Sequence, residues 1–565
     1  MVATPVSDRA ARPKATDLDD LDIAAQLAKE MSPRFARLSP EERAALLREL
    51  IPSTAAAAEG WVRAACEAKR IPFDAPVSGE EWLAGPAVVV RNLRLLAESW
   101  ERIAAGRSPI DGLPVRRRDG LAEVDVFPAG PYDGLLFAGF RATVIARDSE
   151  ALAGPDAPSG GCCLILGAGN VSSIPAMDAL YKLFVEGKTC VLKMNPVNDW
   201  AGPFIERAFA ALVSRGFLEV VYGGAEAGEF LCRHPAIDEV HITGSDRTHD
   251  LIVWGPPGPE RDRRKAANDP VLRKPVTSEL GNVSPVAIVP GPYTERQLGF
   301  MARNVAGMVT NNASFNCNAA KMLVTAKGWP QRDRFQFLLT QALAATATRD
   351  AYYPGAFDRY DALLKGRHAG VVTVGTRKDG KLPWTLVEGL DPSDTKEPLF
   401  RTEPFCGILG ETIVASTDPE DFLWTMTLFC NHRLWGTLNA SVIVHPETEK
   451  RHQAALERAI AELDYGTVAV NHWPALGYGF VSPPWGGAPG ATLADVKSGI
   501  GWVHNTFMLR DVVKSVIRGP LTVSPKPAWF ADNRRCHEIG RKLVAFEASP
   551  SWTRLPGIIA SAVRG

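Results

Sequence analysis

Short strand patterns alternate with helical patterns between residues 162 and 243, and this alternation constrains the fold more than any other feature of the chain. The strand patterns are CCLILG, KTCVLKM, LEVVYG and DEVHIT, and a helical pattern separates each from the next. Parallel strands need such crossover connections, so the spacing predicts a parallel, doubly wound α/β sheet with helices on both faces. Ligands of these sheets bind beyond the carboxyl ends of the strands.

The composition is that of a folded protein whose default partners are small molecules. The chain has 565 residues, which suggests about three folding units, and its 46% hydrophobic and 22% charged residues are ordinary globular usage. A net charge of -1 gives no reason to expect a nucleic acid or an acidic membrane surface as a partner. The nine cysteines show no paired CxxC spacing, so we expect no metal site and a reducing cytoplasm. No run of about 18 apolar residues occurs, and we expect neither export nor a transmembrane segment.

Two glycine-containing segments follow predicted strands. Residues 167–173 read GAGNVSS, and such small residues let the backbone approach an anion or a substrate oxygen closely. Residues 241–246 read HITGSD and place Gly244 and Ser245 just past a strand end, where a pyrophosphate commonly binds. Taken alone, each segment is also explained by a tight turn.

A carboxylate and a cysteine are the candidate reactive side chains. Glu279 precedes a flexible Leu-Gly pair in SELGN, which suits a general base that swings toward a water, although a surface carboxylate has the same signature. Cys317 lies among asparagines in NNASFNCNAAK, and amide donors stabilise both a thiolate and a later oxyanion. We expect the other eight cysteines to be small buried hydrophobic residues, which is also the common role of a lone cysteine.

Together these segments resemble, in order and spacing, the aldehyde dehydrogenase superfamily from about Ser39 to Thr506. VLKMNP, TEPFCGIL and SPPWGG add further matches to that family's motifs. The resemblance implies that Cys317 is the nucleophile, Glu279 the general base and Asn170 the oxyanion-hole donor. It implies NAD or NADP as cofactor, bound by Gly169, Lys193, Thr243, Gly244, Ser245, Leu280, Glu403 and Phe405.

The chain departs from the family pattern at three positions. The family's nucleophile lies five residues before an arginine, whereas Cys317 lies four before Lys321, so an ungapped match places Asn316 at the nucleophile. Pro196 stands where many NAD-preferring members carry a glutamate, which leaves NADP open. Asn282 ends SELGN where glycine is usual, and the tail beyond Thr506 is longer than in common members.

The resemblance and the changes of residue composition along the chain predict an α/β, aldehyde dehydrogenase-like architecture with a Rossmann-type domain. A charged, proline-rich loop over residues 255–275 is taken as the main domain boundary. The expected parts are a flexible arm (1–20), a cofactor-binding domain (21–115 and 159–273), a β-rich oligomerisation element (116–158 and 478–535), a catalytic domain (274–477) and a C-terminal extension (536–565).

The resemblance implies oxidation of an aldehyde to a carboxylic acid through a thiohemiacetal and a thioester on Cys317, with Glu279 activating the hydrolytic water. One alternative is a CoA-acylating enzyme, although members of that kind commonly lack the glutamate. A second alternative is a non-catalytic scaffold that keeps the fold. The family also implies a homodimer or homotetramer, in which the segments 116–158 and after about Tyr478 pair across subunits.

Overall fold

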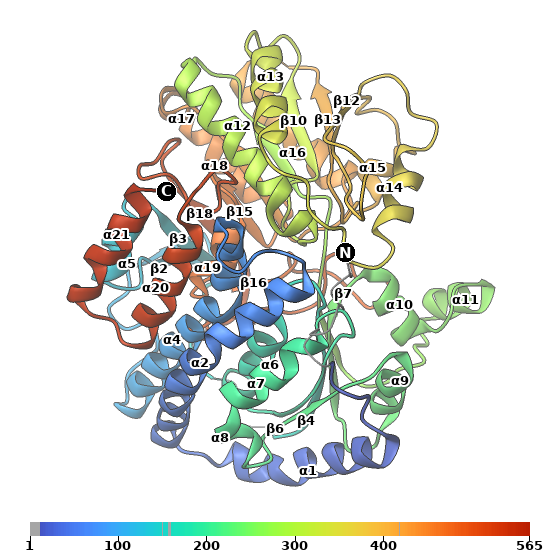
Figure 1. Ribbon diagram of the computed structural model, residues 1–565, viewed down its shortest axis with the longest axis vertical. Coiled ribbons are helices and arrows are strands. Elements are labelled where there is room, and N and C mark those ends of the chain that lie inside the picture. The colour runs from blue at the N-terminus through green and yellow to red at the C-terminus, as the bar shows by residue number, and fades with distance from the viewer. Residues whose placement is uncertain (1–11, 150, 156–159, 417) are drawn as a thin grey trace, which may run out of the picture.

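The computed structural model describes residues 12–149, 151–155, 160–416 and 418–565 (Figure 1). Of the expected flexible arm, residues 1–11 lie outside the described part. Helix α1 (Leu18–Ala36) begins inside that arm, where the Asp17 carboxylate accepts the Asp20 N–H at 2.9 Å. This N-cap satisfies a backbone donor that a helix end otherwise leaves open, so the ordered chain starts earlier than its composition predicted.

A five-stranded parallel sheet forms the first α/β unit, as the strand spacing predicted. Its order is β6 (Leu218–Val221), β5 (Thr189–Lys193), β4 (Cys162–Leu166), β7 (Glu239–Gly244) and β8 (Val276–Leu280). The domain boundary expected at residues 273–274 is wrong, because β8 pairs with β7 and belongs to this sheet. The charged loop before β8, which contains α11 (Pro259–Ala267), is therefore a crossover connection within the unit.

Successive residues of β4 point to opposite faces of this sheet, as the strand pleat requires. Cys163 and Ile165 pack in the hydrophobic cluster that includes α2 (Pro40–Ala68), α4 (Val88–Ala104) and α6 (Ile174–Phe184). Cys162 and Leu164 pack in the cluster that includes α1 and α9 (Ala225–Arg233). The two clusters cover opposite faces and leave the carboxyl ends of the strands free for a ligand.

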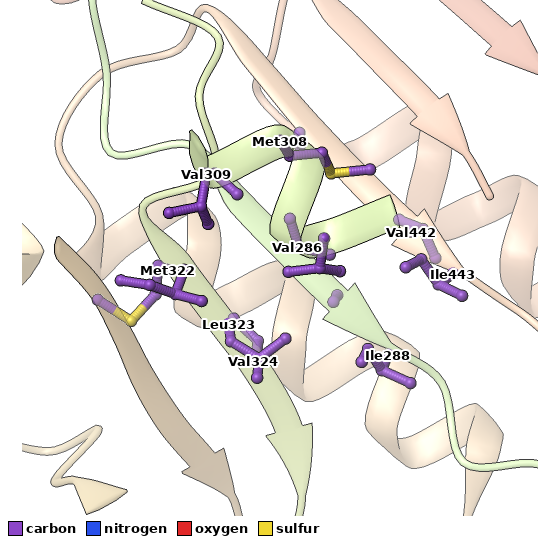
Figure 2. Packing of buried hydrophobic residues seen from close by; sticks show 14 of the residues in the cluster. Val286, Ile288, Met308, Val309, Met322, Leu323, Val324, Val442 and Ile443 are labelled. Atoms are coloured by element: carbon purple, nitrogen blue, oxygen red, sulfur yellow. The ribbon is translucent and has the colours of Figure 1, made fainter. Parts of the chain in front are cut away.

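The second unit is an eleven-stranded mixed sheet. Its order is β1 (Val115–Arg118), β2 (Leu121–Phe127), β3 (Arg141–Arg147), β18 (Val512–Arg518), β15 (Thr467–Val470), β14 (Asn439–Ile443), β9 (Pro285–Ile288), β10 (Met322–Ala326), β13 (Ile408–Val414), β12 (Trp384–Leu390) and β11 (Val371–Val374). The central strands β14, β9, β10 and β13 run parallel and are buried on both faces. Figure 2 shows side chains of β9, β10 and β14 packed together with Met308 and Val309 of α12 (Glu295–Thr310).

The β-rich segments continue this sheet within the chain. Strand β18 pairs in parallel with β15 on one side and antiparallel with β3 on the other, and β2 pairs antiparallel with β3. The two segments that the resemblance assigned to pairing across subunits are thus already joined in one copy, because β18 carries a complete ladder on both edges.

The remaining elements are short helices, two short strands and the C-terminal pair. They are α3 (Gly79–Trp82), α5 (Pro131–Leu136), α7 (Gly202–Ala208), α8 (Ala210–Val213), α10 (Asp246–Trp254), α13 (Arg332–Ala344), α14 (Ala356–Leu364), α15 (Pro398–Arg401), α16 (Pro419–Arg433), α17 (Pro446–Arg451), α18 (Gln453–Glu462), α19 (Ala475–Phe480), β16 (Pro484–Trp485), β17 (Val503–His504), α20 (Cys536–Ala548) and α21 (Leu555–Val563), with short 3₁₀ and π segments at 76–78, 83–87, 199–201, 311–314 and 552–554.

The C-terminal extension packs on the N-terminal helices beside α4 and α5 (Figure 1). Buried Arg91 of α4 bonds to Asp133 of α5 and to Glu547 of α20 at 2.8–2.9 Å. A buried charge is tolerated only when it is paired in this way, so the triad fixes α20 in place. Among the described residues, no helix is both long and apolar enough to cross a membrane.

Candidate active site

A cavity of about 830 Å³ lies beyond the carboxyl ends of β4, β5, β7 and β8. Its other wall comes from the second unit, through the loop that carries Cys317 and the segment around Glu403. The lining includes ten of the eleven residues that the resemblance selected, namely Gly169, Asn170, Lys193, Thr243, Gly244, Ser245, Glu279, Cys317, Glu403 and Phe405. Leu280 is not part of the lining; it is fully buried, and its N–H is bonded to the Ser498 carbonyl at 3.0 Å.

The β5 and β7 ends of the cavity fit a dinucleotide. Lys193 is the last residue of β5 and is nearly buried, and burial lowers the pKa of its ammonium group. Ser245 is the N-cap of α10, where its hydroxyl accepts the Thr248 N–H at 3.2 Å. A helix N-terminus that borders a cavity favours a negatively charged group such as a pyrophosphate.

Glu403 is positioned for a neutral, hydroxyl-bearing ligand. Its Oε1 atom is buried and accepts no hydrogen bond from the residues that the structure describes, which is costly unless a ligand donates one. Burial raises the pKa of this carboxyl to about 8. Gly281 is required beside it, since a Cβ at that position would lie 2.1 Å from Glu403 Oε2. Arg359 fixes the same segment by donating to the Pro404 and Phe405 carbonyls at 3.2 Å.

The loop of residues 311–321 brings Cys317, and not Asn316, to the cavity. Cys317 is partly exposed, while the other eight cysteines, all of them described, are buried. The Asn316 amide is buried and donates to the Asn311 side chain at 2.9 Å. Lys321, at the family's arginine position, is fully buried and donates to the Ser314 carbonyl and hydroxyl at 2.9 Å. The one-residue offset in the sequence is therefore absorbed within this loop.

The offset is accommodated by an unusual backbone. Asn312, Ala313 and Ser314 have φ values of 51°, 53° and 69°, a region that residues with a Cβ seldom adopt. The Asn312 amide holds this conformation by donating to the Asn170 and Phe315 carbonyls at 3.0 and 3.1 Å. Buried Lys69, paired with Glu81, donates to Asn312 Oδ1 at 2.9 Å. Such strain persists only where the surroundings over-determine it, which is typical of functional loops.

Asn170 lies between this loop and the end of β4. One N–H of its side chain donates to the Phe315 carbonyl at 2.9 Å. An amide nitrogen carries two hydrogens, so the second remains available to an oxyanion. Asn170 thus contacts the loop two residues before Cys317, which fits the role that the resemblance assigns.

Burial favours the protonated form of both the Cys317 thiol and the Glu279 carboxyl. Burial, reinforced by the charges of Glu279 and Glu403, raises the pKa of the Cys317 thiol well above its usual range. Burial also raises the pKa of Glu279 to about 8. The two side chains interact directly, so the carboxylate is the natural acceptor of the thiol proton once it is ionised.

Trp485 is a site residue whose role the sequence did not reveal. It occupies the phenylalanine position of the family's Pro-Phe-Gly-Gly signature, and its indole N–H donates to Glu279 Oε1 at 3.0 Å. The substitution of Trp for Phe was visible in SPPWGG, but only the fold shows that the added N–H meets the glutamate.

The structure also accounts for Asn282. Its buried side chain donates to the Asn439 carbonyl at 2.9 Å and accepts the Ser284 hydroxyl at 2.7 Å. Ser284 and Asn439 in turn donate weakly to the Cys317 carbonyl, at 3.3 and 3.4 Å. Gly436 makes room for this side chain, since a Cβ on Gly436 would lie 2.5 Å from the Asn282 Cβ.

We expect Gly436→Ala to destabilise the protein by about 2 to 4 kcal/mol, because it adds a steric clash to an unfavourable φ of 89°. The shift of the urea denaturation midpoint measures this loss. Gly380→Ala is the matched control, since Gly380 has a φ of 77° but no heavy atom within 4 Å of its Cβ position. Adding Asn282→Gly to Gly436→Ala should recover part of the loss; no recovery would mean that the contact with Asn282 is not its cause.

Part of the chain is similar in sequence to known proteins. Residues 151–350 match the model of the aldehyde dehydrogenase family. Human 4-trimethylaminobutyraldehyde dehydrogenase is 32% identical over 129 residues, and the match covers 23% of this chain and 24% of that protein. The similarity in sequence to this curated relative thus spans about a quarter of its length.

Solved structures extend the likeness to the whole fold. An NADP-dependent glyceraldehyde-3-phosphate dehydrogenase from Bacillus halodurans C-125, complexed with NADP, superposes with a TM-score of 0.61 at 18% identity, covering 89% of this chain and 92% of that one. Aldehyde dehydrogenase C from Pseudomonas syringae, complexed with NAD+ and octanal, gives a TM-score of 0.61 at 15% identity, covering 91% of each chain.

The fold and the cavity thus define an α/β protein of the kind that places a cysteine and a carboxylate beside a dinucleotide cleft. Residues 151–350 thus match the aldehyde dehydrogenase family, and the chain shares its overall fold with solved dehydrogenase structures.

Proposed function

We propose that this chain oxidises an aldehyde to a carboxylic acid with NAD or NADP, using Cys317 as nucleophile, Glu279 as base and Asn170 as oxyanion donor. One observation carries the proposal: Cys317, Glu279 and Glu403, whose Oε1 atom accepts no hydrogen bond from the described residues, line a single cavity beyond the carboxyl ends of a parallel sheet. The similarity to a dehydrogenase of 4-trimethylaminobutyraldehyde and to structures with NADP or NAD+ bound supports the same class of reaction.

The cofactor fits the residues present. Glu403 would bind the hydroxyls of the nicotinamide ribose, Ser245 and the α10 N-terminus the pyrophosphate, and Lys193 the adenosine ribose. When bound, the nicotinamide supplies the acceptor for the hydride. Pro196 has no carboxylate that would repel the 2′-phosphate of NADP, so we propose that NADP is accepted as well as NAD.

The chain's own residues then perform the acyl chemistry. Ionised Glu279 accepts the Cys317 proton, the sulfur bonds to the aldehyde carbon, and the side chain of Asn170 with a backbone N–H stabilises the oxyanion. After oxidation, the carbon is a thioester. Glu279, having lost its proton to solvent, deprotonates a water whose oxygen bonds to that carbon while the C–S bond breaks, which releases the carboxylate and restores Cys317.

Two finer assignments follow from the same proposal. The five-stranded unit binds the cofactor and the eleven-stranded unit supplies the nucleophile. The protein works as a homodimer or homotetramer, as the resemblance implies, and in the cytoplasm, as the absence of paired cysteine spacings indicates. A monomeric mass in solution would overturn the oligomer.

A panel of aldehydes tests the function directly. Purified protein with NAD or NADP should form reduced cofactor, seen by absorbance at about 340 nm, together with one carboxylic acid per turnover and without added CoA. Turnover only with CoA would establish the acylating alternative, for which hydrolysis by Glu279 is not needed. Absence of turnover with every aldehyde and cofactor would contradict the proposal and favour a non-catalytic scaffold.

A further inference from the structure

The carboxylate that we propose as the general base accepts a hydrogen bond from a buried indole. Trp485 and Glu279 are 1% and 5% exposed, and the indole N–H donates to Glu279 Oε1 at 3.0 Å. An indole nitrogen can only donate, so the carboxylate oxygen it holds must be the acceptor. The remaining oxygen of Glu279 is left for Cys317 or for a water beside it.

The indole itself has little freedom to move. Trp485 pairs with Val503 across the two-stranded ladder of β16 and β17, and its ring packs with Leu438 and Val503. The Ser515 hydroxyl holds the Pro484 carbonyl at 2.9 Å. The ring also meets Tyr478 edge-on, at 6.0 Å between centroids and 89° between planes. The donor therefore presents one direction to the site.

The strand that carries Glu279 is fixed to the same region of the chain. The N–H groups of Ser278 and Leu280 donate to the Ile500 and Ser498 carbonyls at 2.8 and 3.0 Å. The Ser498 hydroxyl donates to the Gly281 carbonyl at 2.8 Å. The segment between residues 484 and 504 thus carries the donor, Trp485, and also bonds to the strand that carries the acceptor, Glu279. The contact is therefore preorganised.

We propose that Trp485 is a positioning residue, whose indole N–H holds Glu279 turned toward Cys317 and stabilises its ionised form for the hydrolysis of the thioester. This inference rests on the proposed function. A phenylalanine, which the family motif carries at this position, offers the same apolar ring but no hydrogen for the carboxylate.

Charge in the pocket makes this donor important. Burial raises the pKa of Glu279, and the charge of Asp178 on α6 adds to that effect, whereas the bond from Trp485 lowers it. The other titratable groups that face Glu279 are Cys317, Glu403 and Tyr478, which supply no positive charge. The indole N–H is therefore a main support of the carboxylate at neutral pH.

Trp485→Phe tests the inference through the titration of Glu279 itself. The carboxyl band in infrared spectra, assigned by its loss in Glu279→Gln, should titrate at about 8 in the parent protein. We expect Trp485→Phe to move that midpoint up by about one to two pH units, as loss of a hydrogen bond to an ionised group predicts. Trp384→Phe, which loses an indole bond of 3.0 Å to the Thr346 carbonyl outside the cavity, should leave the midpoint unchanged.

Kinetics give the second readout. With an aldehyde that is turned over, Trp485→Phe should keep the initial burst of reduced cofactor while its steady-state rate falls about tenfold or more at pH 7.5 and recovers as the pH rises. An unchanged midpoint in Trp485→Phe would overturn the inference even if the parent protein oxidises aldehydes. Absence of turnover by the parent protein would overturn the proposed function instead, and with it the hydrolytic role of the contact, although the titration would still decide whether Trp485 sets the ionisation of Glu279.

Discussion

Cys317→Ala is expected to abolish aldehyde oxidation, lowering kcat/KM by about 10⁴-fold or more, because the other cysteine of the lining, Cys232, is buried and only Cys317 is partly exposed. Alanine removes the sulfur without adding volume, so cofactor binding and thermal stability should stay near those of the parent protein. Reduced-cofactor absorbance and fluorescence titration with the cofactor measure the two properties separately.

Cys430→Ala is the matched control. Cys430 is buried on α16 in the core of the second unit and is not among the residues that line the cavity. We expect full activity from this variant at a cost in stability of about 1 kcal/mol for the small cavity it leaves. If Cys317→Ala retains activity comparable to that of Cys430→Ala, the nucleophile has been misassigned.

Glu279→Gln should separate the two halves of the reaction. Gln is nearly isosteric and can still accept the Trp485 N–H, but it cannot take a proton from water. The variant also lacks the carboxylate that accepts the Cys317 proton, but loss of its charge removes one cause of the high pKa of that thiol, so the proton can pass to water and acylation continues. We expect a burst of about one reduced cofactor per chain, followed by a steady-state rate lower by about 10²- to 10⁴-fold.

Glu388→Gln removes a carboxylate of β12 outside the cavity and should behave as the parent protein does. A Glu279→Gln variant with an undiminished steady-state rate would show that water is activated elsewhere. Restoration of its rate by CoA would instead show that the thioester forms normally and that only the hydrolytic water lacks a base.

Much of the fold could be predicted from the sequence, because strand spacing and crossover helices are local patterns. The parallel sheet from β4 to β7 follows from residues 162–243 alone. The assignment of β8 failed for a physical reason: the loop before it is charged and proline-rich like a linker, and only pairing with β7 reveals it as a crossover. The continuity of β3 with β18 is also non-local, and no short pattern encodes it.

The sequence predicted which residues line the candidate site better than it predicted the contacts between them. Motif order selected Glu279, Cys317 and Glu403, and the structure brings all three to one cavity. The sequence did not reveal that Gly436 makes room for the Asn282 side chain, because the two residues lie far apart along the chain. The contact of Trp485 with Glu279 likewise joins residues more than 200 positions apart.

The central claim is that a covalent acyl intermediate forms on Cys317, and peptide mapping of that intermediate tests it most directly. Glu279→Gln is mixed with an aldehyde and oxidised cofactor, quenched in acid during the burst, digested and analysed by mass spectrometry. The account predicts one modified peptide, with the adduct on Cys317 and a mass gain equal to that of the aldehyde less two hydrogen atoms. Reduced cofactor with the adduct on another residue, or with none on Cys317, would contradict it.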